Sequence, residues 1–151
     1  KQFKKMIVSH VGTNPETANQ MNSGETEVVL TPQGTLAEKI RCGGNGLGGF
    51  YTPTGIGTEV AEGKEIRVIN SKEYMFETPL RADVALLKAS VADKKGNMIF
   101  NKTMKNFNPI MATAADLVIV EADKIVEVGE IDPEHVMCSG IFVDYIVGGD
   151  K

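Results

Sequence analysis

Residues 31–58 bring together the residue types best suited to holding a small substrate. The stretch reads TPQGTLAEKIRCGGNGLGGFYTPTGIGT, in which a short helix-forming segment is followed by a glycine-rich turn and an extended TPTG segment. Glycine lets the backbone adopt positive φ angles and approach a ligand closely. So dense a cluster of glycines indicates a loop held in one shape, and we expect part of a binding site here.

Gln33 has the clearest chemical role in this stretch. Its neutral amide can donate hydrogen bonds to a substrate carboxylate without forming a lasting ion pair. It lies just before a predicted helix N-terminus, where backbone N–H groups and the helix dipole favour anions. The alternative is that Gln33 only ties the loop down, and the residue types leave both roles open.

Three further residues complete the predicted substrate-binding set. Gly49 and Phe50 end the glycine loop, and we expect Phe50, with Tyr51, to wall an apolar pocket. Asn106 lies in the NFNP segment. Ordinary packing of the aromatic rings and a plain turn role for Asn106 are the alternatives.

Gly44, Gly46 and Gly49 also satisfy the dinucleotide-binding pattern G-x-G-x-x-G. That pattern needs a strand before it and a helix after it. Here it follows a predicted helix and runs into Thr52-Pro53, so we do not expect a dinucleotide site. A tight backbone crossing is a simpler role for these glycines.

The first half of the chain alternates strand and helix patterns. Apolar runs at 5–12 and 27–30 predict buried strands, and His10 in the first run is interpreted as a satisfied core side chain. An Asn-Pro pair followed by an acidic residue predicts a helix over 14–23.

A second helix is predicted over 34–42. Thr35 and Glu38 have the spacing of a capping box, and Gly43 supplies a stop signal. The resulting β-α-β-α order predicts an α/β fold with a largely parallel central sheet and flanking helices.

The second half of the chain is richer in strands. A hairpin is predicted around Asn70-Ser71-Lys72, and another Asn-Pro pair predicts a helix over 108–116. Further strands are predicted at 83–92, 98–101, 117–121 and 141–147. Neither a linker nor an internal repeat separates these elements, so residues 1–151 are predicted to form one domain.

Composition excludes several classes of function. A net charge of −4 argues against nucleic-acid binding, and no apolar run approaches the roughly 20 residues of a membrane span. Cys42 and Cys138 show no metal-ligand spacing and are expected to be buried or idle thiols in a reducing cytosol. No metal site is predicted.

The stretch 31–58 resembles the α (A) subunit of the family I coenzyme A transferases, of the acetate/butyrate–acetoacetate and 3-oxoacid type. Further matches are SHVGTNPET at 9–17, LRADVALLKA at 80–89 and KNFNPIMATAADLVIVEAD at 105–123. The matches follow the family order along nearly the whole chain. An N-terminal βα segment with a GGF-type glycine loop, which these subunits share, is not among the matched residues.

The resemblance implies a fold shared with the sugar-phosphate isomerases and a cytoplasmic enzyme. It would move coenzyme A, as a substrate and not a resident cofactor, from a short-chain acyl-CoA to acetate, butyrate or acetoacetate. The nucleophilic glutamate, which becomes a glutamyl-CoA thioester, is implied on a β (B) subunit in an α2β2 tetramer. No catalytic residue is therefore expected in this chain.

The resemblance also places Gln33, from the PQGT motif, at the acyl substrate. Arg81 and Lys88 are candidates to pair with carboxylates of the partner chain. A non-catalytic ligand-binding or sensor domain on the same scaffold is the alternative function, because fold alone does not fix function.

Overall fold

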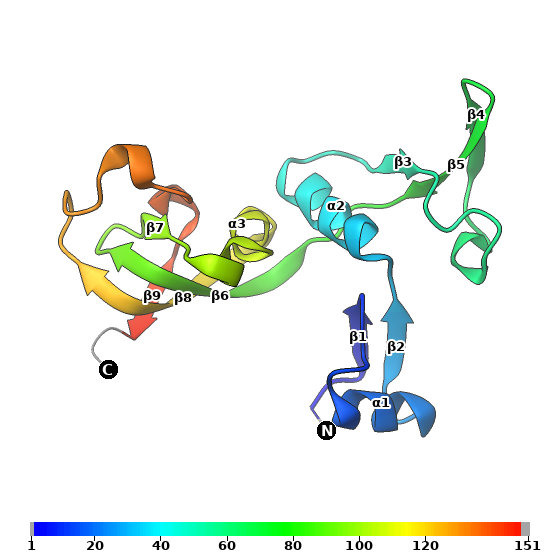
Figure 1. Ribbon diagram of the computed structural model, residues 1–151, viewed down its shortest axis with the longest axis horizontal. Helices are drawn as coiled ribbons and strands as arrows, with labels where there is room; N and C mark the ends of the chain where they lie inside the picture. The colour runs from blue at the N-terminus through cyan, green and yellow to red at the C-terminus, as the bar shows by residue number, and fades with distance from the viewer. Residues whose placement is uncertain (1, 149–151) are drawn as a thin grey trace. The chain divides into compact units, whose positions relative to one another are not determined.

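The computed structural model describes residues 2–148 as two compact units (Figure 1). The first unit comprises the chain up to Lys39 together with Phe50–Thr78. The second comprises Ile40–Gly49 and the chain from Pro79 onward. The α/β class is confirmed, while a single domain over 1–151 stays a prediction.

A parallel strand pair opens the first unit. β1 (Lys5–Val8) pairs in register with β2 (Glu27–Leu30), and α1 (Pro15–Asn22) provides the crossover between them. Asn14 caps α1 by accepting a hydrogen bond from the backbone N–H of Thr17 at 3.1 Å. The predicted helix over 14–23 is therefore confirmed, together with its cap.

The strand predicted over 5–12 is too long. β1 ends at Val8, and His10 lies beyond it with an exposed side chain. The interpretation of His10 as a core histidine is wrong, because the parallel register with the four-residue β2 ends at Val8 and Leu30.

Helix α2 (Gln33–Gly44) begins earlier than predicted. Its first hydrogen bond runs from the Leu36 N–H to the Pro32 carbonyl, at 2.9 Å. Thr35 therefore lies inside the first turn and is buried, and the capping box that we predicted with Glu38 is wrong.

The end of α2 is a Schellman motif. Gly46 has a φ of 68°, and its N–H bonds to Gly43 O while that of Leu47 bonds to Cys42 O. These bonds satisfy carbonyls that would otherwise be unpaired at the helix end. The helix thus runs through the predicted stop at Gly43 and ends at Gly44.

An antiparallel sheet completes the first unit. β3 (Phe50–Thr52) and β4 (Ile66–Ile69) flank the central β5 (Lys72–Glu77). Asn70 and Ser71 both have positive φ angles, which suits the two-residue turn between β4 and β5. The predicted hairpin is confirmed.

The second unit is built on a mixed sheet of order β7-β6-β8-β9. β6 (Ala82–Asp93), β8 (Ala115–Val126) and β9 (Tyr145–Gly148) are parallel, and β7 (Met98–Ile99) returns antiparallel to β6. One face of this sheet packs against the short helix α3 (Asn108–Met111) and the segments around it. The core includes Leu87, Ala89, Met98, Phe100, Ala112, Val118 and Val120.

The helix predicted over 108–116 is only one turn long. Asn108 is its first residue and not its N-cap, because its side chain is engaged elsewhere. Oδ1 accepts from the Lys88 N–H at 3.0 Å, and Nδ2 donates to the Met104 carbonyl at 2.9 Å. Residues from Ala115 onward instead enter β8, since they pair with β6.

The last strand is also shorter than predicted. Residues 141 and 142 belong to a 3₁₀ turn, in which the Ser139 hydroxyl accepts from the Ile141 N–H. Similar turns are Glu59–Ala61, Lys102–Lys105 and Pro133–His135. The strands of residues 2–148 therefore lie in three sheets, and parallel pairing is confined to β1–β2, β6–β8 and β8–β9.

Candidate functional site

Gln33 is held by its side-chain oxygen at the start of α2. Ser9, in the loop after β1, donates from Oγ to Gln33 Oε1 across 2.5 Å. No acceptor for Gln33 Nε2 is found within residues 2–148, and the side chain is exposed. The amide is thus tethered through its oxygen, while its N–H groups remain available for a further hydrogen bond.

An open cavity of about 470 Å³ adjoins the first turns of α2. Gln33 is the sequence neighbour of the lining residue Gly34 but does not itself line the cavity. The lining includes Gly34, Thr35, Glu38, Phe50, Tyr51 and Thr52. The cavity therefore brings the predicted Phe50 together with the helix start, inside the first unit.

Thr35 is the unusual member of this lining. Only 4% of the residue is exposed, and its Oγ1 has no hydrogen-bond partner among the described residues. An unpaired buried hydroxyl costs about 1–3 kcal/mol. A ligand or chain segment that reached this hydroxyl would relieve that cost.

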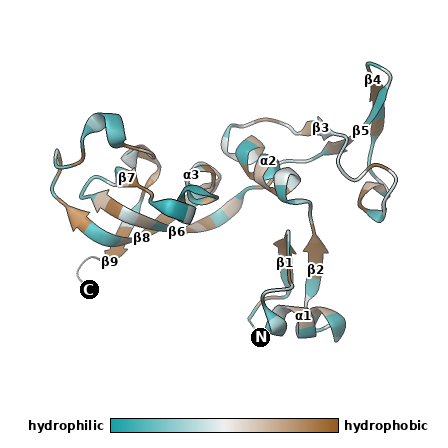
Figure 2. Cartoon of the chain, in the orientation of Figure 1, coloured by the Kyte–Doolittle hydropathy of each residue, from teal (hydrophilic) through white to brown (hydrophobic). Residues whose placement is uncertain are grey.

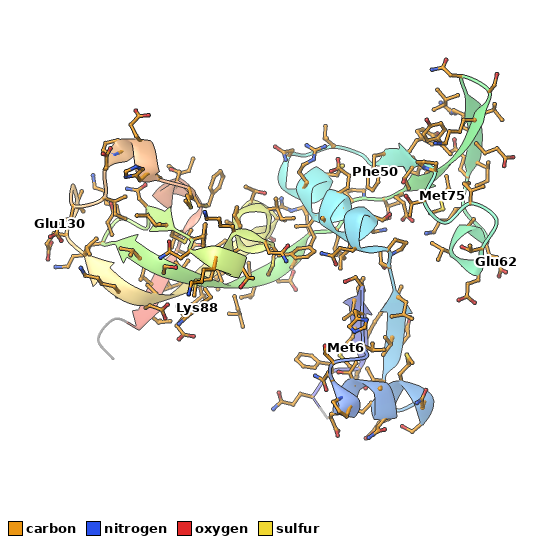
Figure 3. The ribbon with its side chains drawn as sticks, viewed as in Figure 1. Met6, Phe50, Glu62, Met75, Lys88 and Glu130 are labelled. Atoms are coloured by element: carbon orange, nitrogen blue, oxygen red, sulfur yellow. The ribbon has the colours of Figure 1, made fainter. Side chains whose placement is uncertain are left out.

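The two aromatic residues differ in their surroundings. Phe50 begins β3 at the cavity (Figure 3). Tyr51 packs against Phe76 with ring centroids 5.2 Å apart, and the Arg67 guanidinium lies 5.0 Å from its ring centre. A hydrogen bond from the Tyr51 hydroxyl to the Glu65 carboxylate raises the pKa of Tyr51. Tyr51 is thus fixed by structural contacts, whereas a substrate role for Phe50 stays a prediction.

A second, charged cavity of about 600 Å³ lies beside β2 in the same unit. Glu77 is only 3% exposed there and accepts from Lys39 at 2.9 Å and from Lys64 at 2.5 Å. Burial alone would raise the pKa of Glu77, but the two lysine hydrogen bonds outweigh it and lower the pKa below its ordinary value. This carboxylate is ion-paired, which makes it a poor nucleophile.

Gly49 and Asn106 belong to the second unit. Gly49 has a φ of 140°, and Asn106 is exposed at the end of the 3₁₀ turn Lys102–Lys105. Their substrate roles stay predictions.

Gly44 lies in the helix and Gly46 closes it, so the glycine pattern follows a helix and runs into β3, as the sequence indicated.

Arg81 and Lys88 pair within this chain. Arg81 Nη2 lies 2.9 Å from Asp116, and its Nη1 donates to the Gly43 carbonyl. Lys88 contacts Asp123 at 2.7 Å and Glu121 at 2.8 Å, and hydrogen bonds from Lys88 to these carboxylates raise its pKa. Both side chains thus form ion pairs inside the second unit, and their pairing with carboxylates of a partner chain stays a prediction.

Cys42 and Cys138 are both buried, as predicted, and burial raises the pKa of the Cys138 thiol. Among residues 2–148, no group of three or more His, Cys, Asp or Glu side chains is arranged to hold a metal ion. None of the helices formed by these residues has the length and apolar character that crossing a membrane requires.

The sequence model of coenzyme A transferases matches residues 1–149. The chain belongs to the coenzyme A transferase family. A crystal structure of an acyl-CoA transferase from Escherichia coli O157:H7 superposes with a TM-score of 0.87 at 22% identity, covering 95% of this chain and 32% of that chain. That likeness confirms the fold.

Two relatives from this family are much closer in sequence. Acetate CoA-transferase subunit alpha of Escherichia coli K12 is 53% identical over 97% of this chain, which covers 66% of that protein. The acetoacetyl-CoA:acetate/butyrate CoA transferase alpha subunit of Clostridium acetobutylicum is 50% identical over 97% of this chain and 67% of its own length. The chain thus spans about two-thirds of these relatives.

Ser9 and Thr35 are the candidate site residues that sequence reasoning missed. Ser9 lies in the SHVGTNPET match, but nothing in its local sequence shows that it meets Gln33, 24 positions away. Thr35 was assigned to capping because its spacing to Glu38 fits that motif, and only the earlier helix start reveals its burial.

Proposed function

We propose that this chain forms part of the α subunit of an enzyme that transfers coenzyme A from a short-chain acyl-CoA to acetate, butyrate or acetoacetate. The identity of 50–53% to alpha subunits named for acetate, acetoacetate and butyrate carries this proposal. Coenzyme A is a substrate of the enzyme and is not a resident cofactor.

The cavity at the start of α2 is our candidate for the carboxylate and acyl end of the substrate. Gln33 Nε2 would donate to the carboxylate, and its oxygen is already fixed by Ser9. Phe50 would contact the acyl chain from the cavity wall. The dipole and free N–H groups of a helix N-terminus favour an anion at this place.

The nucleophile is proposed to lie on a partner β subunit, within an α2β2 assembly in the cytoplasm. Its glutamate would attack the acyl-CoA carbonyl and displace the coenzyme A thiolate, which gives a mixed anhydride. The thiolate would then attack the glutamyl carbonyl of the anhydride, releasing the acyl group as a free carboxylate and leaving a glutamyl-CoA thioester. Glu77 is unsuited to this role because two lysines hold its charge. Glu38 lines the cavity, so it is the carboxylate of this chain whose substitution tests whether the nucleophile lies on the partner subunit.

Substitution of Gln33 in the complete two-chain enzyme tests the substrate role. Charge-assisted hydrogen bonds contribute about 1.5–3 kcal/mol each, so Gln33→Ala should lower kcat/KM for the carboxylate about tenfold to a hundredfold. The KM for the carboxylate should rise, while the affinity for coenzyme A should barely change. Gln33→Glu should be more severe, because a negative charge would repel the substrate.

Two control variants separate binding from tethering. Asn19→Ala removes an exposed amide from α1 and should leave the kinetics unchanged. Ser9→Ala removes the tether but keeps the Gln33 N–H groups. If Gln33→Ala lowers the melting temperature while kcat/KM stays at wild type, Gln33 is a tether only. Ligand binding without any turnover would favour the sensor alternative.

A further inference from the structure

The candidate substrate cavity lies between one helix and one strand. α2 contributes Gly34, Thr35 and Glu38 to its lining, and β3 contributes Phe50–Thr52. The backbone hydrogen bonds of a helix stay within the helix, so side-chain contacts hold α2 against its neighbours. The distance between α2 and β3 sets the width of the cavity.

β3 is fixed in turn by its pairing with β5. In the antiparallel register Phe50 lies opposite Glu77, and Tyr51 lies opposite Phe76. Residues paired in this way share one face of the sheet, with Cβ atoms about 4.5–5.5 Å apart. The carboxylate of Glu77 therefore starts from the same face of the sheet as the Phe50 wall of the cavity.

Glu77 connects this sheet to α2. Hydrophilic and hydrophobic residues are mixed along α2 (Figure 2), and Lys39 directly follows Glu38 of the cavity wall. Lys39 Nζ donates to Glu77 Oε2 at 2.9 Å, and the side chain of Lys39 is only 16% exposed. A pair so well shielded from water is screened much less by salt than a surface pair. The ion pair thus joins one cavity wall to the strand that holds the other.

Lys64 is the second cation at this carboxylate. Its Nζ lies 2.5 Å from Glu77 Oε1, and it comes from the loop before β4. Lys64 is not a lining residue of the substrate cavity and does not belong to α2 or β3. Of the two lysines, Lys39 alone joins the cavity walls, and this difference allows the two contacts to be tested against each other.

We infer that Glu77 is a positioning residue for the substrate cavity, because its ion pair with Lys39 fixes α2 against β3 and so selects the length of acyl chain that the cavity admits. The inference rests on the proposed function, which places the acyl end of the substrate in this cavity. Glu77 itself does not line the cavity. Without the pair α2 would be free to move away from β3, so a small carboxylate would lose contacts and a longer one would gain room.

The test measures chain-length preference in the complete two-chain enzyme. Butyryl-CoA is the donor, and kcat and KM are determined for acetate and hexanoate as acceptors. Lys39→Met removes the charge but leaves Glu77 paired with Lys64, so the chain should still fold. One methylene in an apolar pocket is commonly worth about tenfold or more in kcat/KM. The kcat/KM for acetate should therefore fall about tenfold, chiefly through KM, and the hexanoate-to-acetate ratio should rise about tenfold.

Two further variants examine the ion pair itself. Lys39→Arg keeps a cation opposite Glu77 and should retain the wild-type ratio. Glu77→Asp keeps the charge but shortens its reach, so the ratio should shift in the same direction as in Lys39→Met. A merely structural role would lower the melting temperature in these variants without changing the preference for chain length.

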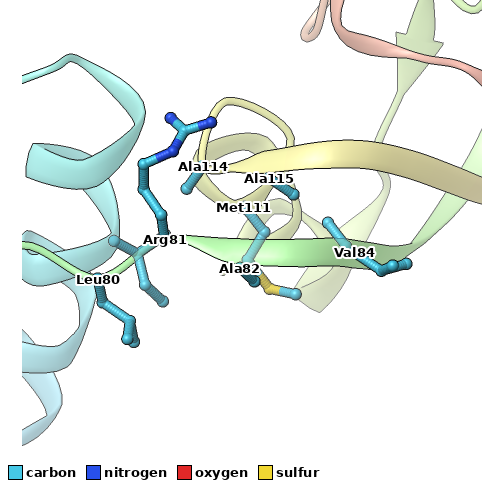
Figure 4. Close-up of a pocket in the computed structure, with 9 residues that line it drawn as sticks. Leu80, Arg81, Ala82, Val84, Met111, Ala114 and Ala115 are labelled. Carbon is cyan, nitrogen blue, oxygen red and sulfur yellow. The ribbon is translucent and has the colours of Figure 1, made fainter.

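Two controls should keep the wild-type ratio. Lys64→Met removes the other lysine from the same carboxylate and leaves the contact between Lys39 and Glu77 in place. Val84→Ala alters a different cavity, the apolar pocket of about 190 Å³ in the second unit (Figure 4). Leu80 and Met111 also line that pocket.

Four results would overturn the inference. If Lys39→Met keeps the wild-type ratio while Gln33→Ala is impaired, the proposed function stands and the positioning role fails. If both variants have wild-type kinetics, the cavity does not hold the substrate and the proposed function fails as well. Equal shifts in Lys39→Met and Lys64→Met would reduce Glu77 to a stabilising charge. A shift in Val84→Ala would place the acyl chain in the other pocket.

Discussion

Glu77 shows at the residue scale how this chain accommodates a buried charge. Removing one partner from a buried ion pair is costly, because the remaining charge is left uncompensated away from water. Lys39 and Lys64 both reach Glu77, one from α2 and one from the loop before β4, so the pairing joins segments far apart in sequence. No local pattern marks this contact, and sequence reasoning did not find it.

The lowered pKa of Glu77 predicts a pH dependence of stability. At pH values just below 4.5, which is the ordinary pKa of a glutamate side chain, the unfolded chain binds this proton more readily than the folded chain does. The stabilisation should therefore be complete above about pH 5 and be lost as the pH falls from 4.5 through the lower folded value. Glu77→Gln should cost about 1.5–3 kcal/mol at pH 7. It should also flatten the decline of the free energy of unfolding between pH 6 and 3.

Urea titrations across that pH range provide the measurement. Glu73→Gln is the matched control, since Glu73 lies exposed on the same strand β5. If the free energy of unfolding falls equally steeply with pH in Glu77→Gln and in wild type, Glu77 is not the carboxylate responsible for the decline.

At the scale of elements, α2 depends on glycines that allow close packing. A Cβ added at Gly43 would lie 2.1 Å from the Leu80 carbonyl oxygen, and one at Gly44 would lie 2.0 Å from Thr113 Oγ1. Both neighbours belong to the second unit, as do these glycines. The end of α2 can therefore lie against Leu80, just before β6, and Thr113, just before β8, only because these two glycines lack side chains.

Gly43→Ala should consequently destabilise the chain. Alanine favours a helix over glycine by about 1 kcal/mol, but a clash with backbone cannot be relieved by a rotamer change. Overpacking costs about 1–3 kcal/mol, so we expect a net loss of about 1–2 kcal/mol and a lower melting temperature. Gly34→Ala in the same helix is the control, because nothing lies within 4 Å of its added Cβ. Equal melting temperatures for the two variants would refute the close-packing explanation.

The elements that sequence predicted well were those with local signals. Asn14 capped α1 as expected, and the turn at Asn70 and Ser71 formed the expected hairpin. The misjudged ends depended on long-range contacts. Asn108 turns its side chain to β6, and the Ala115 segment joins β8 because a parallel partner is available there.

The candidate site was predictable in composition but not in assembly. The glycine loop, Gln33 and Phe50 could be named from residue types and from the family resemblance. The tether from Ser9 could not, because it joins residues 24 positions apart, and the buried hydroxyl of Thr35 could not, because it depends on where α2 begins. Gly49 and Asn106 lie in the second unit, and their roles await kinetic tests.

At the scale of the whole molecule, the central claim is that this chain holds substrate while a partner subunit carries the covalent intermediate. The claim fits the ion pairing of Glu77 and the family membership, and it leaves Glu38, which is half-buried and lines the cavity, as the alternative in this chain. Activity alone would not separate these possibilities, since either subunit could hold the nucleophile in an active complex.

Intact-protein mass spectrometry of the two-chain enzyme decides the matter most directly. The enzyme is incubated with acetyl-CoA without an acceptor carboxylate, and borohydride-treated and untreated samples are compared. We predict one coenzyme A adduct on the partner subunit, removed by borohydride as expected for a thioester, and an unchanged mass for this chain. An adduct on this chain that Glu38→Gln abolishes would contradict the account. A result in which neither subunit carries an adduct would also contradict it.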